Sequence, residues 1–256
     1  MPMSPRTRTG NDSLFLMRHL PRTLVAVAAL SLFLVACDGG RNVEASGKIV
    51  KRDMDLKNFD SVEVSNAIEA DLRQGNEFRV EIEADEAAIP YIDVRTRGDN
   101  LVIGTKDSWG FRNIEIRVSV TMPKLKGLNA SGASRVTLDD FASDERVEIE
   151  SSGASKIEGD LDAGDTRIQA SGASNIKLNG HGSSLRADAS GASHLDLADY
   201  HVEDADVRAS GASSISAGPK GRLDADASGA SHITYYGNPK LGRTQSSGGA
   251  SINAGN

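Results

Sequence analysis

Serine is the residue type whose repetition first suggests chemistry in this chain of 256 residues. The quartet Ser-Gly-Ala-Ser occurs six times and is followed by one altered copy, Ser-Gly-Gly-Ala; the copies begin at Ser131, Ser152, Ser171, Ser190, Ser210, Ser228 and Ser247. A nucleophilic serine needs a histidine base and an acid that orients this base. Nothing in the sequence pairs a histidine and an acid with any one copy, and seven nucleophiles would serve no mechanism. We therefore expect a structural role for all the copies.

Four histidines of the repeat region are candidates for metal binding. His194 and His232 occupy the same position, three residues after the repeat glycine, but the copy between them has Ser214. In stacked repeats these two rings would lie about 10 Å apart, too far to share one zinc ion. His181 and His201 fall in variable segments. We expect all four rings to be exposed and the chain to bind no metal ion.

Carboxylates are the residues that glycoside hydrolysis or calcium binding would use. The column three residues before the repeat glycine mixes Asn, Glu, Gln, Asp and Arg, and the column five residues after it is equally mixed. Neither column gathers acids at the separation that glycosidases need. The quartet also lacks the fixed carboxylate of calcium-binding repeats. We expect these charges to solvate the surface, with no catalytic residue and no cofactor.

An aromatic pair is the remaining candidate for binding a partner. Trp109, the only tryptophan, and Phe111 lie in the polar segment Lys-Asp-Ser-Trp-Gly-Phe-Arg-Asn. Exposed aromatic side chains often anchor sugars or partner proteins. The same two side chains could instead cover an apolar end of the fold. Both interpretations remain open at this stage.

The N-terminus indicates export and lipidation. From Met17 the chain has basic residues, an apolar run over residues 24–36 and small residues before Cys37, which is the plan of a secretory signal. Residues 34–37, Leu-Val-Ala-Cys, resemble the bacterial lipobox, in which the cysteine is acylated and becomes the mature N-terminus. We predict lipidation at Cys37, which would hold the protein at a membrane. A plain secretory signal with an incidental cysteine is the alternative, and Asp38 favours the inner membrane over the outer one.

Charge and cysteine content exclude two other classes of protein. Without residues 1–36 the chain has 25 basic and 35 acidic residues, a net charge of −10. Such a chain is a poor partner for phosphate backbones, so we expect no nucleic-acid binding. Cys37 is the only cysteine, which excludes a disulfide framework.

The spacing of the repeat predicts the elements that carry these residues. The repeat glycines follow one another at intervals of 18 to 21 residues and are Gly132, Gly153, Gly172, Gly191, Gly211, Gly229 and Gly248. Positions four and two before each glycine, and four after it, are apolar or small, while the positions between them are polar. This is the alternation of strands with one buried face. Recurrence near 19 residues favours the coils of a right-handed parallel β-helix, an all-β solenoid, with the quartet at a tight corner where serines stack in ladders.

Four segments follow from these patterns. They are a lipoprotein signal over residues 1–36, a lipidated tether over 37–48, an irregular N-terminal β region over 49–127 and the regular repeat over 128–256; the last two are expected to form one continuous domain. Residues 59–75 keep the alternation around Ser65 and Asn66 and are interpreted as an eroded coil. The rest of the irregular region either caps the solenoid or folds over its end as a small β-domain.

The mature region resembles the bacterial auto-transporter adhesin head domain, or GIN domain. The stretch Phe-Asp-Ser-Val-Glu-Val-Ser-Asn-Ala-Ile-Glu-Ala-Asp-Leu and the quartets with a branched residue two positions later, such as Ile157 and Ile176, carry this resemblance. It implies an exported or lipid-anchored protein with a right-handed β-helix.

Two functions remain as expectations. The favoured one is a non-enzymatic, lipid-anchored protein of the bacterial cell envelope whose β-helix binds an envelope protein or glycan. The alternative is a β-helix protein that binds or degrades envelope polysaccharide, which would need convergent acids that the columns do not provide.

Overall fold

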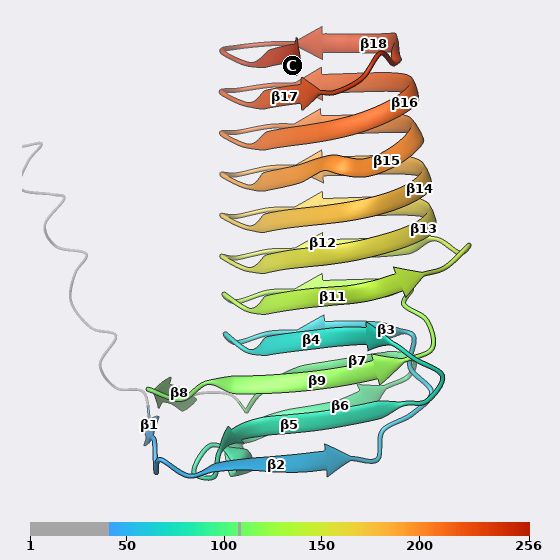
Figure 1. Ribbon diagram of the computed structural model, residues 1–256. Coiled ribbons are helices and arrows are strands. Elements are labelled where there is room, and N and C mark those ends of the chain that lie inside the picture. The colour runs from blue at the N-terminus through green and yellow to red at the C-terminus, as the bar shows by residue number, and fades with distance from the viewer. Residues whose placement is uncertain (1–40, 107–108) are drawn as a thin grey trace, which may run out of the picture. The chain divides into compact units, whose positions relative to one another are not determined.

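The computed structural model describes residues 41–106 and 109–256. The predicted signal, Cys37 and Asp38 therefore lie outside the described residues. The described part is built of strands, with one short 3-10 helix, η1 (Ile89–Tyr91). None of its helices is long and apolar enough to cross a membrane. The strands stack as the coils of a β-solenoid (Figure 1), which confirms the predicted all-β class.

The regular coils each combine one strand that ends at a quartet with one that begins after it. Their strands pair in parallel and are β10 (Gly127–Ala130), β11 (Arg135–Ala142), β12 (Val147–Ser151), β13 (Lys156–Ala170), β14 (Asn175–Ala189), β15 (His194–Ala209), β16 (Ser214–Ala227), β17 (His232–Tyr235), β18 (Lys240–Ser246) and β19 (Ser251–Ala254). Ile157 stands opposite Ile176, and Ile168 stands opposite Ala187. Alignment on the repeat glycine therefore reproduces the register in the structure.

The core is a narrow column of stacked side chains. Ile157, Ile176 and Leu195, four residues after successive repeat glycines, are fully buried. Alternate residues along each strand point inward, so the polar residues between them face outward. Burial of one branched apolar side chain contributes about 1.5–3 kcal/mol, so the stability of the stack accumulates coil by coil. The largest fully buried side chain, Tyr200, donates or accepts a 2.6 Å hydrogen bond with the buried Thr166 hydroxyl.

One coil lies beneath the first quartet coil although it comes earlier in the chain and has no quartet. Its strands β3 (Ser61–Val64) and β4 (Glu69–Gln74) pair with β10 and β11. Asn66 and Ala67 make its corner with φ values of 63° and 59°. The Ala67 N–H donates to the carbonyl of Gly132 at 3.0 Å, which joins this corner to the next one.

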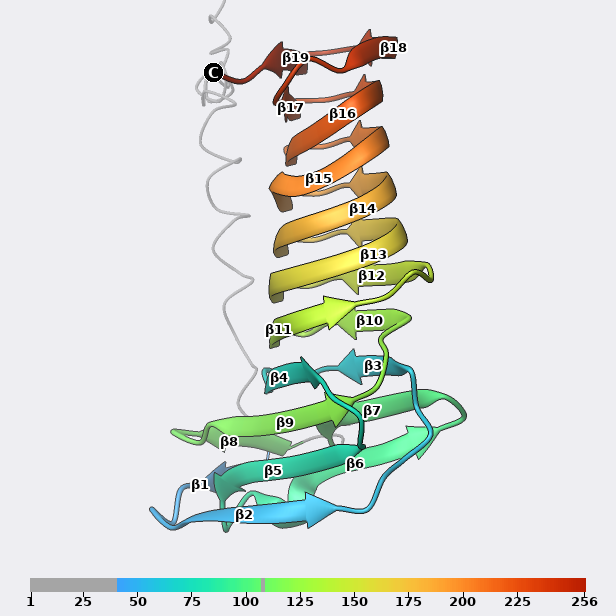
Figure 2. The same ribbon diagram turned by 45° about the vertical axis from the view of Figure 1, so that its right-hand side comes forward.

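The remaining N-terminal strands extend and then close the solenoid. Strands β7 (Asn100–Thr105) and β9 (Ile116–Met122) continue the two faces in parallel below β3 and β4. Beyond them β6 (Ile92–Arg97), β5 (Arg79–Asp85) and β2 (Ile49–Met54) pair antiparallel (Figure 2). Residues 49–127 thus contain one coil and a cap over the end of the stack.

Residues 41–48, within the segment predicted as the lipidated tether over 37–48, contain a strand. Strand β1 (Arg41–Glu44) pairs in parallel with β8 (Trp109–Arg112) as a separate two-stranded sheet. Val43 is buried, and the following Ser46 and Gly47 donate hydrogen bonds to the Asp85 carboxylate. Residues 41–48 of the predicted tether therefore contain a paired strand and hydrogen bonds to the buried Asp85 carboxylate.

Candidate binding surface

The quartet corners depend on glycine. All seven repeat glycines have positive φ, from 63° at Gly132 to 75° at Gly229. A Cβ added to Gly172 would lie 2.5 Å from the carbonyl oxygen of Gly153 in the preceding coil. The same carbonyl accepts a 2.7 Å hydrogen bond from the Ala173 N–H, so the corners approach closely enough to pair along the stack. Only glycine combines this backbone conformation with this separation.

The second serine of each quartet forms a buried ladder that the structure places inside the corner. Its members are at most 1% exposed and are Ser134, Ser155, Ser174, Ser193, Ser213 and Ser231. The Ser193 hydroxyl, for example, lies 2.8 Å from the Ser190 carbonyl and 3.4 Å from the Ala170 carbonyl of the preceding coil. Among the described residues no buried side-chain nitrogen or oxygen lacks a partner, so the corner carries polar groups without an unpaired one.

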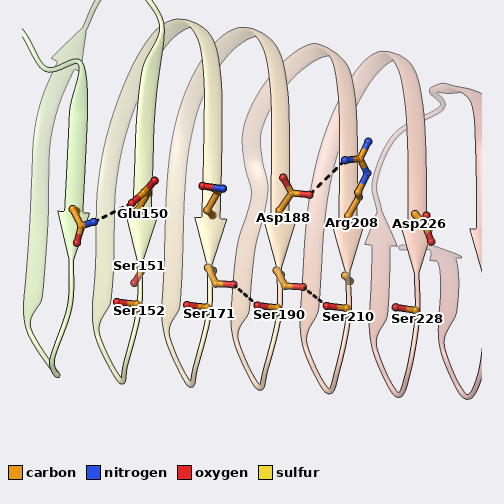
Figure 3. Close-up of a pocket in the computed structure, with 15 residues that line it drawn as sticks. Glu150, Ser151, Ser152, Ser171, Asp188, Ser190, Arg208, Ser210, Asp226 and Ser228 are labelled. Atoms are coloured by element: carbon orange, nitrogen blue, oxygen red, sulfur yellow. Dashed lines mark hydrogen bonds and ion pairs between the residues drawn. The ribbon is translucent and has the colours of Figure 1, made fainter.

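The first serine of each quartet lies at the surface and lines an open groove. This groove has a volume of about 570 Å³ and contains the outer serines Ser152, Ser171, Ser190, Ser210 and Ser228. Their backbone N–H groups are used between coils, as where Ser190 donates to Ala170 at 2.9 Å. Figure 3 shows the outer serines side by side along the stack; the Ser190 and Ser210 hydroxyls lie 3.4 Å from backbone carbonyl oxygens of the preceding coils. We call this open groove the serine groove.

The other wall of the serine groove is the polar column three residues before the repeat glycine. Its side chains are Asn129, Glu150, Gln169, Asp188, Arg208 and Asp226. At about 4.8 Å per coil they extend over about 24 Å. Sequence analysis interpreted these residues as solvating charges and did not associate them with the outer serines. The common register of the two columns was the signal that could have joined them.

The electrostatic character of the serine groove is acidic and rich in hydrogen-bonding groups. Asn129 Nδ2 donates to Glu150 at 3.0 Å (Figure 3). Arg208 donates to Asp206 at 2.8 Å and lies 3.9 Å from Asp188. This wall carries three carboxylates and one guanidinium, together with two side-chain amides. The groove can therefore bind a polar, extended partner through many weak hydrogen bonds.

The two predicted contact aromatics occupy strand β8, away from the serine groove. Phe111 is partly buried and packs against the core, whereas the half-buried Trp109 stacks on Tyr91 with ring centroids 4.1 Å apart. Strand β1 supports both through its pairing with β8. The pair lies beside the cap, and neither ring lines the groove.

The Asp85 carboxylate lies at the cap, and its pKa is strongly lowered by the groups around it. It is 2% exposed and accepts hydrogen bonds from Ser46, Gly47 and Ala87 at 2.8–3.1 Å. Burial raises the pKa of Asp85, but the hydrogen bonds from these backbone and side-chain donors outweigh it and lower the pKa to about 2. This carboxylate fastens the chain before β2 to the cap, which is a structural role.

The histidines are distributed differently from the sequence-based expectation. His194 and His232 do lie two coils apart, and His194 hydrogen-bonds the intervening Ser214. His181 and His201, which the sequence left unrelated in variable segments, stand opposite each other on neighbouring coils. Within the described residues no group of three or more His, Cys, Asp or Glu side chains is arranged to hold a metal ion.

Comparisons with known proteins agree with the fold. The family model described as "Putative auto-transporter adhesin, head GIN domain" matches residues 58–239, which confirms the resemblance seen in the sequence. No curated protein matches the chain.

Solved structures share the architecture at low sequence identity. A putative adhesin from Bacteroides fragilis is similar with a TM-score of 0.79 and 20% identity, over 83% of this chain and 99% of that one. A putative lipid binding protein from Parabacteroides distasonis has a TM-score of 0.68 and 19% identity, over 84% and 100% of the two chains. A putative adhesin from Parabacteroides merdae has a TM-score of 0.65 and 17% identity, over the same shares. At these identities the likeness shows the fold.

Proposed function

Because the chain belongs to the auto-transporter adhesin head GIN domain family, we propose that it is a non-enzymatic, lipid-anchored adhesion protein of the bacterial cell envelope. In this proposal the serine groove binds the partner, an envelope glycan or an envelope protein. The observation that carries it is the groove itself, which presents five outer serines beside a column of six polar side chains.

The chemistry of the groove favours binding over turnover. Its residues are hydroxyls, amides, three acids and one arginine, and no histidine lines it. The carboxylates of Asp188 and Asp226 come from coils two apart, about 10 Å along one open face. A glycosidase instead holds its two acids on either side of the bond that it cleaves. Repetition along a flat face suits a long partner that contacts many coils.

The anchor in this proposal is Cys37. Three residues lie between it and Arg41, where β1 begins, so at most about 14 Å of chain would join a lipidated Cys37 to β1. The N-terminal end would then be held near the bilayer, with the coils available for contact. We expect Cys37→Ser to move the protein from the membrane fraction to the soluble envelope fraction. Unchanged membrane association of this variant would contradict the lipid anchor.

Binding through the groove is tested with two charge reversals, one inside the groove and one outside it. Arg208→Glu changes the only cation of the groove, whereas Lys177→Glu changes a cation that pairs with Asp196 at 3.3 Å outside it. Full-length protein in detergent is titrated with envelope glycan fragments, and envelope proteins are captured by cross-linking. We expect Arg208→Glu to change partner binding at least about tenfold and Lys177→Glu to leave it within twofold.

The same samples separate the proposal from its alternative. Depolymerised glycan after incubation with the wild-type protein would show the polysaccharide-degrading function and overturn the non-enzymatic one. Equal effects of the two charge reversals would remove the groove from the proposal.

A further inference from the structure

Three polar residues form a column in the bends midway between successive quartets. Asp162 of β13 stands opposite His181 of β14, and His181 stands opposite His201 of β15. The column ends in small residues, because Ala142 precedes Asp162 and Gly218 follows His201 in register. The three side chains thus share one face of three adjacent coils, with no bulky neighbour in the column.

The separation of the two rings fits one shared metal ion. The ring centroids of His181 and His201 lie 5.9 Å apart with their planes tilted by 54°. With Zn–N bonds of about 2.0–2.1 Å, two imidazoles on one zinc ion have ring centres about 5–6 Å apart. Neighbouring coils therefore bring these rings to the distance at which one ion bridges them.

Asp162 orients the His181 ring and favours one of its tautomers. Its Oδ1 accepts the backbone N–H of His181 at 2.8 Å and lies 3.3 Å from His181 Nδ1. A carboxylate beside Nδ1 favours the tautomer with the proton on that nitrogen, which leaves the lone pair on Nε2 free. Metal-binding histidines almost always donate their other ring N–H to a partner, which is a carboxylate, a backbone carbonyl or a water molecule. The hydrogen bond is thus a second observation, independent of the ring distance, that points to a metal ligand.

We propose that His181 and His201 bind one Zn²⁺ ion, with Asp162 as the positioning residue for His181. The protein supplies two nitrogen ligands, which is consistent with the lack of any complete three-residue set among the described side chains. His181 is exposed and His201 half-buried, so water or a carboxylate of a binding partner completes the coordination. Asp160, Asp199 and Glu203 belong to the same bends and add negative charge that attracts a cation.

The other histidine pair is a matched control inside the same molecule. His194 and His232 share one column, but Ser214 lies between them, so their rings are two coils apart. They are exposed, as His181 is, and would bind metal ions only as isolated surface imidazoles.

The experiment titrates full-length protein in detergent, purified without a polyhistidine tag, with Zn²⁺ in a calorimeter. We expect one Zn²⁺ per chain in the wild type and an affinity at least about tenfold lower in His181→Ala and in His201→Ala. Asp162→Asn should weaken binding about tenfold, because it removes only the orienting charge. The double variant His194→Ala/His232→Ala should bind within twofold of the wild type.

A measurement on the unchanged protein protects the test from folding defects of the variants. In nitrogen-detected NMR spectra, Zn²⁺ should shift the ring nitrogens of His181 and His201 together at one equivalent. Lack of saturable binding by the wild type, equal losses in the control double variant, or shifts spread over all four rings would overturn the proposal.

Discussion

The regular coils and the N-terminal cap differ in how their strands pair: strands of the coils pair in parallel, and strands of the cap pair antiparallel. From β12 to β16 each coil pairs in parallel with the one before it, with glycine at every quartet corner and register shifts only between the quartets, as between Lys177 and Gly180. In the cap, β5 and β6 reverse direction and pair antiparallel with β9 and β7. A parallel stack exposes unpaired backbone groups at its end, and an antiparallel cap covers that edge.

The last coil shows what happens without such a cap in the described chain. Strand β18 pairs with β16 on one side, and all seven of its residues are exposed. Its inward positions include Leu241, which is 47% exposed, and Thr244 and Ser246, where earlier coils have apolar residues such as Val207 and Ala209. The two described ends therefore differ: antiparallel strands cover one end, whereas the inward positions of the last described coil are exposed and partly polar. The repeated coils form the stack, and the elements at its two described ends depart from the repeat.

We expect the largest effect on the unfolding free energy at the corners, which occur both in the regular coils and in the early coil. Gly172→Ala places a side chain at positive φ and 2.5 Å from the Gly153 carbonyl, so we expect a loss of about 2–4 kcal/mol in unfolding free energy. At the corner of the early coil Asn66 matches the repeat glycine, and both Asn66 (φ 63°) and the next residue, Ala67 (φ 59°), already carry side chains at positive φ. Ala67→Gly should therefore cost nothing and add up to about 1 kcal/mol.

Urea unfolding followed by circular dichroism measures both changes. A Gly172→Ala protein as stable as the wild type would mean that the regular corners tolerate what the early corner tolerates. The proposed difference between the regular corners and the corner of the eroded coil would then be wrong.

A smaller effect on stability is expected from substitution of two of the four tyrosines, Tyr200 in the regular coils and Tyr91 in the cap. Tyr200 is fully buried in the coils and hydrogen-bonds Thr166, and burial is the main cause that raises its pKa above the usual value. Tyr200→Phe leaves the Thr166 hydroxyl buried without this partner, so we expect a loss of about 1–2 kcal/mol. Tyr91 of the cap is half-buried and stacks on Trp109, which phenylalanine would preserve.

Tyr91→Phe should therefore change the unfolding free energy by less than about 0.5 kcal/mol. Denaturant titrations of the two variants, run side by side with the wild type, give the difference. Equal losses would indicate that polar satisfaction matters no more inside the coils than at the cap.

The same contrast explains how much could be predicted from the sequence. Counting from Gly153 and Gly172 predicted that Ile157 and Ile176 are inward neighbours, because a coil of constant length transfers register from copy to copy. Counting residues from the repeat glycine does not predict neighbours correctly where the length of the coil changes. His181 lies nine residues after its glycine and His201 ten, and a register shift between Lys177 and Gly180 brings them together.

The cap could not be predicted from local patterns. Strands β7 and β9 extend the faces below β3 and β4, yet the chain then returns to the other side of that coil to form β10. Alternation identifies each of these strands but does not say which pairs with which, because pairing here joins segments far apart in the sequence. The serine groove was missed for a related reason, since its two walls come from columns that sequence analysis considered separately.

The smallest effect is expected at Asp85, which fastens the segment before β2 to the cap. Asp85→Asn keeps an acceptor oxygen but removes the charge that Ser46, Gly47 and Ala87 stabilise. The folded-state pKa, about 2, lies below the ordinary value of 3.8, so this carboxylate adds stability that is fully present above about pH 4 and is lost as pH falls through 2. The melting temperature of Asp85→Asn should therefore lie a few degrees below that of the wild type at pH 7, and the two should converge between pH 4 and pH 2. A difference in melting temperature that stays constant down to pH 2 would mean that packing, and not the charge, fastens this segment. A matched Asp165→Asn variant on the exposed surface of the coils serves as the control and should show a smaller difference from the wild type at every pH.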